Sequence, residues 1–463
     1  VMSEYAYYDI AVVGAGLAGV CAAISAAAFP KTRVLLLESA SKPLPYTKTQ
    51  PFYDGAINAV DPAAQGRQGI FDFPELFMQQ TLERSGYRAS PELVRELCYR
   101  SYDAKVWLRN LGAEFMPKTV QLPGSGFPRG AYFRDLSQFR ECLLKALLAG
   151  GVDSVCSASV KQLERKDEVW KLTYAENSGA IREVRALSVI ACCGGFVSDD
   201  RICSFHDPRN RGLRSIDPTH GRSVDFLKAL VRNGAGCVGM DFLDYLTVLN
   251  DSVPTQLRLP TQASVLVSRD GRLLAAGLDS VERTEALLSS PDHTAYALFP
   301  SSMTENLPKA QAQAIWRVFS IGEAVCVHRG ESVQEGSFSF VSEPFWRTLT
   351  ADLSAYADRA TRMNERQTPA LPQWIGSEKL MLVKVTLVKQ RTLGGVRIDP
   401  HAQILNALGS PIKGLFAAGE AVGGVHGKSC LPGNSELAAV VFGRTAAESA
   451  SHYLLSLKKL KDF

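Results

Sequence analysis

The run YDIAVVGAGLAG, residues 8–19, restricts the fold more than any other part of the chain. Residues 8–13 are an apolar run typical of a buried strand, and the small residues that follow the glycines continue as a helix. Gly14 permits a tight turn, Gly16 lets a pyrophosphate approach the backbone, and Gly19 lets helix and strand pack closely. The N–H groups at the start of the helix can bind phosphate. A second strand, RVLLLE, ends in Glu38, whose carboxylate can accept hydrogen bonds from an adenosine ribose. The sequence therefore predicts a βαβ unit that binds a dinucleotide.

Two later stretches indicate which dinucleotide to expect. A nicotinamide-dependent dehydrogenase normally completes a doubly wound domain next, but residues 39–58 form an irregular stretch that carries proline and glycine. Buried-strand runs that end in small-residue turns return only at LSVIACCGGF (187–196) and GLFAAGEAVGG (414–424). This layout is typical of a flavoprotein whose FAD domain is split by insertions. The sequence therefore predicts FAD rather than NAD.

Composition and cysteine spacing argue against several other classes of protein. The 463 residues are 46% hydrophobic and 21% charged, which suits two or three globular domains. The net charge of +4 is spread along the chain and indicates neither a nucleic-acid surface nor a polybasic membrane patch. The ten cysteines include no C-x-x-C pair and no zinc or haem spacing, so no metal site is expected.

The same features lead us to expect a cytoplasmic protein. The N-terminal residues enter a strand without a basic region and cleavage site, and no uncharged run reaches about 18 residues. Reduced, mostly buried thiols are the expected state of the cysteines in such a compartment. We therefore expect no membrane span.

The order of predicted elements divides the chain into an α/β domain and an insertion. Residues 1–238 hold the βαβ unit, a helical segment (91–111 and 135–148) and a returning pair of strands. Residues 239–380 contain the hairpin ASVLVSRDGRLL and helices around 309–318 and 343–364. QTPALPQWIG is the clearest linker before the chain returns to the first domain at 381–463. The predicted fold class is α/β, a Rossmann-like FAD-binding domain with an inserted α+β capping domain for the substrate.

Five further stretches carry a resemblance to a known family. They are DGAINAV (54–60), PELVRELCYRSYDAKVWLRNLGAEF (91–115), GRSVDFLKALVRNGA (221–235), TLGGVRIDPHAQILNALGSPIKGLFAAGE (392–420) and GVHGKSCLPGNSELAAVVFGR (424–444). With the N-terminal motif, they resemble the fumarate reductase and succinate dehydrogenase flavoprotein family, closest in layout to the soluble fumarate reductases. The resemblance covers roughly residues 8–240 and 380–450, and it implies an FAD-dependent oxidoreductase.

The resemblance also implies which residues bind FAD. Glu420 corresponds to the acid that holds the flavin ribityl chain, and Val160 to the backbone contact with adenine. The segment at the flavin pyrimidine edge corresponds to Asn434, Ser435 and Leu437. A helix that starts near Ser435 would direct its positive end toward N1 and O2 of the flavin. The expected set is completed by residues of the quoted glycine-rich and small-residue stretches: Gly14, Gly16, Gly19, Glu38, Ala56, Asn58, Gly194 and Gly419.

The mode of FAD attachment is expected to differ from that of the membrane-bound relatives. Those relatives attach FAD through a histidine in the loop that here reads PYTKTQPFYDGAINAV (45–60). This loop has no histidine, and Pro51, Phe52, Tyr53 and Asp54 partly replace its glycine-rich sequence. FAD is therefore expected to bind non-covalently.

The substrate positions depart from the family pattern. The family binds a dicarboxylate with two histidines and an arginine in the loop H-G-x-x-R-x-G-G-N. A second arginine, in the cap, acts as the acid that donates the proton. Here Arg391 stands at the first histidine position, DYLTVLNDSVP lacks the second histidine, and Cys430 replaces the loop arginine. Arg283 lies two places from the position of the cap arginine. A cysteine cannot hold a carboxylate as an arginine fork does, so fumarate or succinate is not the expected substrate.

Each candidate for the catalytic set has an alternative, purely structural interpretation. Arg391 can bind an anion or be a solvated loop arginine, and His426 can contact substrate or simply cap and pack. Cys430 can be a small buried hydrophobe, a pocket-lining residue or a nucleophile. Tyr245 and Arg283 can supply a proton or lie on the surface. The pair Cys192 and Cys193 is interpreted as small residues under the FAD rather than a redox pair.

The leading hypothesis is an FAD-dependent oxidoreductase that acts on a carbon–carbon bond next to a carboxylate or another electron-withdrawing group. The flavin would exchange hydride with the substrate at N5, and a cap residue would handle the proton. The alternatives are a flavoprotein that serves as a binding or electron-transfer subunit, and an amine or amino-acid oxidase. The chain has no second dinucleotide motif, haem motif or cluster cysteines. A separate electron donor or acceptor is therefore expected.

Overall fold

The computed structural model describes residues 6–45, 55–122, 125–216, 224–249, 255–256, 264–276, 280–307, 309–363 and 379–461. The chain forms two compact units. The first unit comprises Val1–Asp207, Asp217–Asp244 and Arg391–Phe463, and the second comprises Pro208–Ile216 and Tyr245–Gln390. The predicted limits of the insertion are 239 and 380. Residues 208–216 join the second unit because Lys389 N–H donates to Arg214 O at 2.8 Å and Ser215 forms a parallel bridge with Lys389.

The first unit is built on a mostly parallel sheet with the strand order β19-β20-β9-β1-β2-β6. The hairpin β7–β8 joins it through an antiparallel pairing of β8 with β9. Its strands are β1 (Ala6–Val13), β2 (Val34–Leu37), β6 (Asp153–Val155), β7 (Ala158–Lys166), β8 (Val169–Glu176), β9 (Ile181–Ala191), β19 (Gln403–Leu405) and β20 (Pro411–Ala417). The last strand pairs in parallel with β9, so the C-terminal segment completes the sheet begun at the N-terminus.

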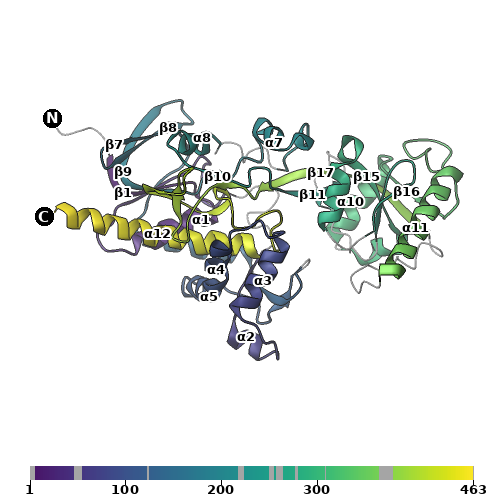
Figure 1. Cartoon of the computed structure of the whole chain (residues 1–463), viewed down its shortest axis with the longest axis horizontal. Helices are drawn as coiled ribbons and strands as arrows, with labels where there is room; N and C mark the ends of the chain where they lie inside the picture. The colour runs from purple at the N-terminus through teal and green to yellow at the C-terminus, as the bar shows by residue number, and fades with distance from the viewer. Residues whose placement is uncertain are drawn as a thin grey trace. The chain divides into compact units, whose positions relative to one another are not determined.

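Two helices that are far apart in sequence lie side by side against this sheet (Figure 1). They are α1 (Leu17–Ala27), which follows the glycine turn, and α12 (Asn434–Lys461). A Cβ at Gly443 would lie 2.5 Å from the Ala18 carbonyl oxygen, so only glycine allows this close approach. The N-terminal ends of both helices therefore belong to the same unit.

Five of the described helices and a small sheet extend the first unit. They are α2 (Pro62–Gly66), α3 (Pro74–Arg84), α4 (Pro91–Tyr99), α5 (Ser101–Asn110) and α6 (Leu136–Ala149), with the small sheet β3 (Ala56–Asn58), β5 (Pro128–Tyr132) and β4 (Val120–Gln121). Of these helices, α4 and α5 pack against α12, and α6 packs against α1. Arg129 of β5 is fully buried and pairs with Asp72 at 2.6 Å, and its Nη1 donates to Gln80 at 2.8 Å. Because a buried charge is costly unless it is paired and hydrogen-bonded, this pair fixes the small sheet that carries β3.

Short elements complete the first unit. They are α7 (Asp200–His206), α8 (Val224–Arg232), β10 (Cys237–Val238), β18 (Gly395–Val396) and the 3₁₀ turn η7 (Gly419–Ala421). The antiparallel pair of β10 and β18 ties the segment before residue 244 to the segment after residue 391. The two stretches that border the insertion are thereby held together.

The second unit is a mainly antiparallel sheet with the order β12-β11-β17-β15-β13-β14, and β16 also pairs with β17. Its strands are β11 (Leu243–Leu249), β12 (Thr255–Gln256), β13 (Val265–Val267), β14 (Leu273–Ala275), β15 (Thr294–Pro300), β16 (Ala324–Val327) and β17 (Leu380–Thr392). Its helices are α9 (Ser280–Leu288), α10 (Lys309–Ser320) and α11 (Glu343–Met363), with 3₁₀ turns η1 (Pro208–Asn210), η4 (Pro291–His293) and η5 (Ser301–Asn306). The predicted hairpin is β13–β14, and the predicted linker 367–376 lies outside the described residues.

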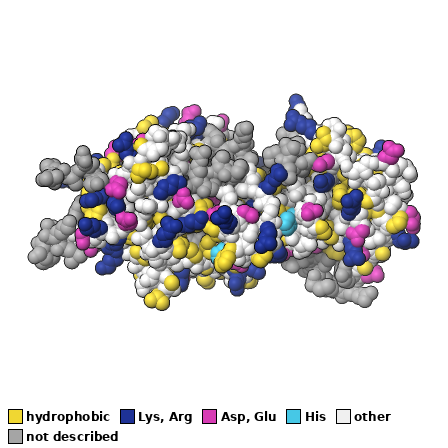
Figure 2. Space-filling view, turned by 90° about the horizontal axis from the view of Figure 1, so that it is seen from above, with side chains coloured by type: hydrophobic (Ala, Val, Ile, Leu, Met, Phe, Trp, Pro, Cys, Tyr) yellow, Lys and Arg dark blue, Asp and Glu magenta, His cyan; other side chains and the backbone are white. Residues whose placement is uncertain are grey.

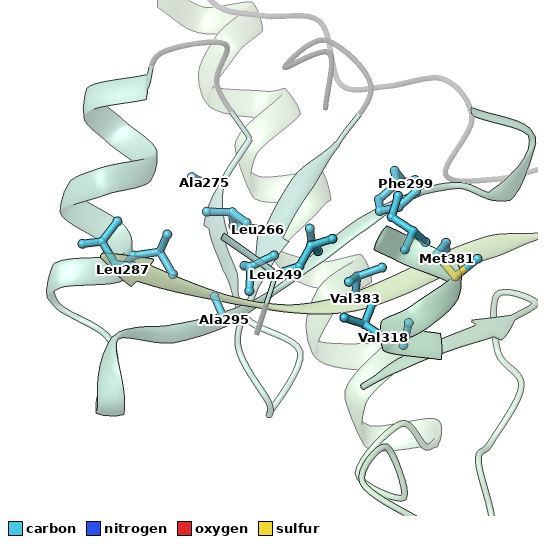
Figure 3. Close-up of a cluster of buried hydrophobic side chains, with 14 of the residues drawn as sticks. Leu249, Leu266, Ala275, Leu287, Ala295, Phe299, Val318, Met381 and Val383 are labelled. Carbon is cyan, nitrogen blue, oxygen red and sulfur yellow. The ribbon is translucent and has the colours of Figure 1, made fainter. Parts of the chain in front are cut away.

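The core of the second unit lies on both faces of this sheet. Met381 and Val383 of β17 pack in the cluster drawn in Figure 3, together with Leu287 of α9 and Val318 of α10. Leu382, between them, packs in a second cluster with residues of α11. Neighbouring side chains of a strand point to opposite faces, so helices cover both. The expected fold class is confirmed: an α/β unit with a parallel sheet and an α+β insertion.

The surface agrees with the modest net charge of the sequence. On the face drawn in Figure 2, lysine and arginine side chains are interspersed with acidic ones. Within the described part of the chain, no helix is both long and apolar enough to cross a membrane. The described residues also contain no cluster of three or more histidine, cysteine or acidic side chains placed to hold a metal ion.

Candidate functional site

The glycine turn between β1 and α1 has little room for side chains, except at one point. Gly14 has a φ of +100°, and a Cβ there would lie 2.2 Å from the Cys192 carbonyl oxygen. A Cβ at Gly19 would lie 1.7 Å from the Gly14 carbonyl oxygen, whereas one at Gly16 would meet no atom within 4 Å. Open space over Gly16 at the start of α1, where N–H groups are free to bind an anion, fits a dinucleotide pyrophosphate.

Glu38 lies beside this turn, at the end of β2. Its Oε2 accepts a hydrogen bond from the Ala15 N–H at 2.6 Å, and its Oε1 accepts one from the Ala40 N–H at 2.7 Å. The carboxylate therefore braces the turn. Its contact with a ribose stays a prediction.

The start of α12 contains a buried amide chain. Asn58 Nδ2 donates to Pro432 O at 2.6 Å and to Asn434 Oδ1 at 2.8 Å, and Asn434 Nδ2 donates to Thr81 at 3.2 Å. These bonds fix the orientation of the Asn58 amide. Its Oδ1 is buried and has no hydrogen-bond partner among the described residues. Because a buried acceptor without a donor is costly, this oxygen fits a donor on a bound group.

Glu420 reaches the segment that carries Arg391. Its Oε1 accepts hydrogen bonds from the Thr392 N–H at 2.8 Å and from the Thr392 hydroxyl at 3.3 Å. A Cβ on Gly195 would lie 1.9 Å from the Thr392 hydroxyl oxygen. The predicted FAD segments around Gly194 and Glu420 therefore pack against each other and against Thr392, although they lie far apart in sequence.

The other predicted FAD residues are distributed over the same unit. Ala56 is buried on β3, Val160 is buried on β7, and Leu437 is buried in the first turn of α12. Ser435 O–H donates to Glu436 Oε2 at 2.9 Å. Gly194 and Gly419, which have φ values of +80° and +74°, form turns at the ends of β9 and β20. Pro51, Phe52, Tyr53 and Asp54 lie outside the described residues.

The predicted anion-binding residue Arg391 forms a close ion pair. Its Nε and Nη2 both donate to Asp244 Oδ2, at 3.0 and 2.7 Å. The arginine side chain is 8% exposed and that of the aspartate 28%. Arg391 is therefore not a solvated loop residue. Asp244 was not among the predicted site residues. It lies 147 residues away along the chain, and its signal in the sequence is a complementary charge.

His426 and Cys430 lie together in the loop before α12. Cys430 Sγ is 3.4 Å from His426 Nδ1 and also donates to the Leu431 carbonyl oxygen at 3.4 Å. Burial, with a smaller contribution from the charge of Arg391, lowers the pKa of His426 from 6.5 to about 3. The imidazole is therefore neutral at physiological pH. Arg391, Asp244, His426 and Cys430 form what we call the polar corner of the first unit.

The other two catalytic candidates belong to the second unit. Tyr245 O–H donates to Asn210 Oδ1 at 2.8 Å. Arg283 Nη2 donates to the carbonyl oxygen of Ser264 and, at 3.1 Å, to its hydroxyl. Burial lowers the pKa of Arg283 from its usual value. Each side chain therefore has a partner within its own unit, and its role as a proton donor stays a prediction.

The adjacent cysteines of the ACCGG turn are both buried. Desolvation raises the pKa of Cys193 to about 12 and raises that of Cys192 as well. A thiol is a nucleophile only as thiolate. Both side chains are therefore inert packing groups beside the glycine turn.

Comparison with known proteins agrees with this geometry. A family model described as "FAD binding domain" matches residues 9–435. The chain is 26% identical over 457 residues to an NADH:fumarate oxidoreductase of Klebsiella pneumoniae, which covers 96% of this chain and 48% of that protein. It is 26% identical over 458 residues to a fumarate reductase (cytochrome) of Shewanella frigidimarina, covering 96% of this chain and 77% of that protein.

Solved structures with the same fold include two flavoprotein enzymes. A flavocytochrome c3 fumarate reductase in its open conformation superimposes with a TM-score of 0.76 at 23% identity, covering 97% of this chain and 79% of that one. A 3-ketosteroid-Δ4-(5α)-dehydrogenase of Rhodococcus jostii superimposes with a TM-score of 0.78 at 21% identity, covering 97% and 98%.

The fold and the matching family model define the class of protein, an FAD-dependent oxidoreductase. The chain belongs to the FAD-binding fumarate reductase and succinate dehydrogenase flavoprotein family. It spans about half the length of the Klebsiella relative and about three quarters of the Shewanella one.

Proposed function

We propose that the chain reduces or oxidises a carbon–carbon bond next to a carboxylate or another electron-withdrawing group, and that it is not a fumarate reductase. The observation that carries this proposal is the polar corner. It joins Asp244 to the segment that leads to Thr392 and to the loop that leads to the start of α12. Relatives named for reduction of fumarate, acrylate and urocanate, together with the ketosteroid dehydrogenase, support the same type of bond.

The chain's own residues would hold FAD non-covalently. The glycine turn and Glu38 would take the nucleotide end, while Glu420, Asn58 and the start of α12 would take the flavin end. When bound, FAD supplies the two-electron chemistry, with hydride exchanged at N5. The positive end of α12 would stabilise negative charge on the flavin pyrimidine ring. A side chain of the second unit, Tyr245 or Arg283, would handle the substrate proton.

Electrostatics of the polar corner disfavour a dicarboxylate. Arg391 and Asp244 carry opposite charges and are joined by two hydrogen bonds, and His426 is neutral. Cys430 stands where the family has an arginine, and it offers no charge-assisted fork for a carboxylate. A substrate with a larger, less charged body therefore suits the corner better than a small diacid.

Anaerobic reoxidation of the flavin tests the proposal. The purified protein should contain FAD that is released by acid precipitation, which distinguishes non-covalent from covalent binding. After photoreduction, its flavin should be reoxidised by at least one member of a panel of alkenes activated by carbonyl, amide, ester or carboxylate groups. No reoxidation by any member would reject the proposed reaction, and peroxide formation with an amine substrate in air would favour an oxidase instead.

The electron donor or acceptor is proposed to be a separate molecule. No second dinucleotide motif or haem motif occurs in these 463 residues. Saturable oxidation of NADH by the isolated chain would contradict this. We also propose a cytoplasmic location, which the ten free cysteines support because free thiols persist in reducing compartments.

A second candidate is a flavoprotein subunit without its own small-molecule chemistry. The observation that favours it is the pairing of Arg391 with Asp244, since a neutralised arginine can be purely structural. Such a subunit should bind FAD and exchange electrons with artificial dyes, but no alkene should perturb the spectrum of its flavin.

A further inference from the structure

Backbone contacts between the two segments that carry Asp244 and Arg391 hold this ion pair in position. Leu393 N–H donates to Phe242 O at 2.9 Å, and a Cβ on Gly394 would lie 1.9 Å from Gly239 O. The two segments that carry the pair therefore run in direct contact. Nε and Nη2 of Arg391 both donate hydrogen bonds to Oδ2 of Asp244. Asp244 is consequently held where it cancels the charge of Arg391.

The rest of the polar corner adds no charge. Burial and the neighbouring guanidinium keep His426 unprotonated, which the lowered pKa of about 3 expresses. The Cys430 thiol is buried and contacts the imidazole nitrogen and a carbonyl oxygen. Summed over these four side chains, the formal charge is zero. A ligand that brings a carboxylate to the corner would therefore gain little attraction and would lose its hydration.

We infer that Asp244 is a specificity-determining residue, which neutralises Arg391 so that the site accepts an alkene activated by an uncharged group, such as a ketone, ester or amide, in preference to a carboxylate. This inference rests on the proposed function and narrows its substrate class. Removal of the aspartate charge alone should convert the corner into an anion site, since Arg391 would then present an uncompensated guanidinium in a partly desolvated place.

A pair of probes that differ in charge and hardly in shape tests the inference. Trans-cinnamate and trans-cinnamamide are titrated into the FAD-loaded protein, and the perturbation of the flavin absorption spectrum gives a dissociation constant for each. The wild type should bind the amide more tightly. Asp244→Asn should shift the ratio of the two constants toward cinnamate by about tenfold or more.

Two further variants separate charge from fold. Asp244→Glu keeps the charge and should keep the preference for the amide. Asp103→Asn is the matched control, because Asp103 also pairs with an arginine, Arg444, at 2.6 Å but with its own side chain 58% exposed. It removes the same charge elsewhere in the unit and should leave the ratio unchanged.

The outcomes distinguish this inference from the proposed function. Tighter binding of cinnamate than of cinnamamide by the wild type overturns the inference, and that measurement needs no variant. An unchanged ratio in a folded, FAD-loaded Asp244→Asn also overturns it and leaves Asp244 a merely structural partner. If the ratio shifts as expected but no activated alkene reoxidises the reduced flavin, the charge inference stands and the proposed reaction fails.

Discussion

The glycine turn between β1 and α1 and the polar corner belong to the same unit, but the first is formed by backbone and the second by side chains. The turn is made of backbone, and its glycines at 14 and 19 leave no space for a single Cβ. The corner is made of side chains. Its ion pair joins Arg391 to Asp244, 147 residues away in sequence, and its thiol–imidazole contact lies within one loop. Backbone geometry tolerates little variation because the cofactor and the close packing are fixed. Side-chain pairs can be exchanged without disturbing the fold, so a family can keep its cofactor and change its substrate.

The largest expected effect comes from adding one carbon to the turn. Gly19→Ala would place Cβ 1.7 Å from Gly14 O, which should cost about 3 kcal/mol or more of folding free energy and abolish FAD binding. Thermal unfolding and the FAD-to-protein ratio measure this.

Gly16→Ala sharpens the same comparison, since its Cβ would meet no protein atom. The apo form should keep wild-type stability, while affinity for FAD falls by about tenfold or more because the backbone can no longer approach the pyrophosphate. Unchanged FAD affinity in this variant would show that the phosphates lie elsewhere.

Within the polar corner, the largest effect is expected for Arg391. Arg391→Ala should lower turnover by roughly 100-fold, because the Asp244 carboxylate would remain uncompensated and would oppose negative charge on the activating group of the substrate. FAD content should stay near the wild-type level. Arg182→Ala, which removes an arginine of an exposed ion pair with Glu176, is the control. Full activity in Arg391→Ala would show that Arg391 has no role in the reaction.

His426 should make stability depend on pH. Its folded pKa of about 3 lies below the unfolded value of 6.5, so the unfolded chain binds the proton more readily. The stability is complete above pH 6.5 and falls as the pH drops from 6.5 toward 3. Between pH 7 and 4.5 the loss should reach about 2.5 kcal/mol. Urea unfolding of the wild type and His426→Gln at both pH values measures it.

The variant should lack this part of the pH dependence, whereas Cys430→Ala, which keeps the imidazole, should retain it. Equal slopes for the wild type and His426→Gln would mean that the imidazole titrates alike in the folded and unfolded states. A neutral His426 also predicts no ionisation of this residue in the pH profile of turnover between about pH 5 and 8.

The smallest effect is expected for the thiol. Cys430→Ala should change turnover by only a few-fold and alter selectivity among alkenes more than rate, because Cys430 lines the corner without carrying charge. Cys430→Arg should hinder an uncharged substrate by filling space and adding a charge without a partner. Steady-state kinetics on one ligand panel compare the two. Near-complete inactivity of Cys430→Ala would instead indicate a covalent role for the thiol.

The sequence by itself determined the cofactor and the architecture. The requirement for glycine at residue 19 is local, because its Cβ would meet the Gly14 carbonyl oxygen of the same turn, and the positive φ of the turn itself favours glycine at residue 14. The hairpin β13–β14 and helices α10 and α11 were likewise predicted from short-range patterns. The helical segment 91–111 was predicted as one piece, and the structure divides it at Arg100 into α4 and α5. Local pattern therefore defined the elements, and less securely their ends.

Only the tertiary structure decided how the corner is charged. Arg391 could be read in the sequence as an anion site, but its pairing with Asp244 depends on two segments 147 residues apart that meet through β10 and β18. The neutrality of His426 likewise depends on burial and on a neighbouring guanidinium. Coulombic energies and desolvation depend on distances in space, which no spacing along the chain encodes. The sequence therefore defined the flavin-binding fold, whereas the three-dimensional arrangement set the charge that a substrate meets.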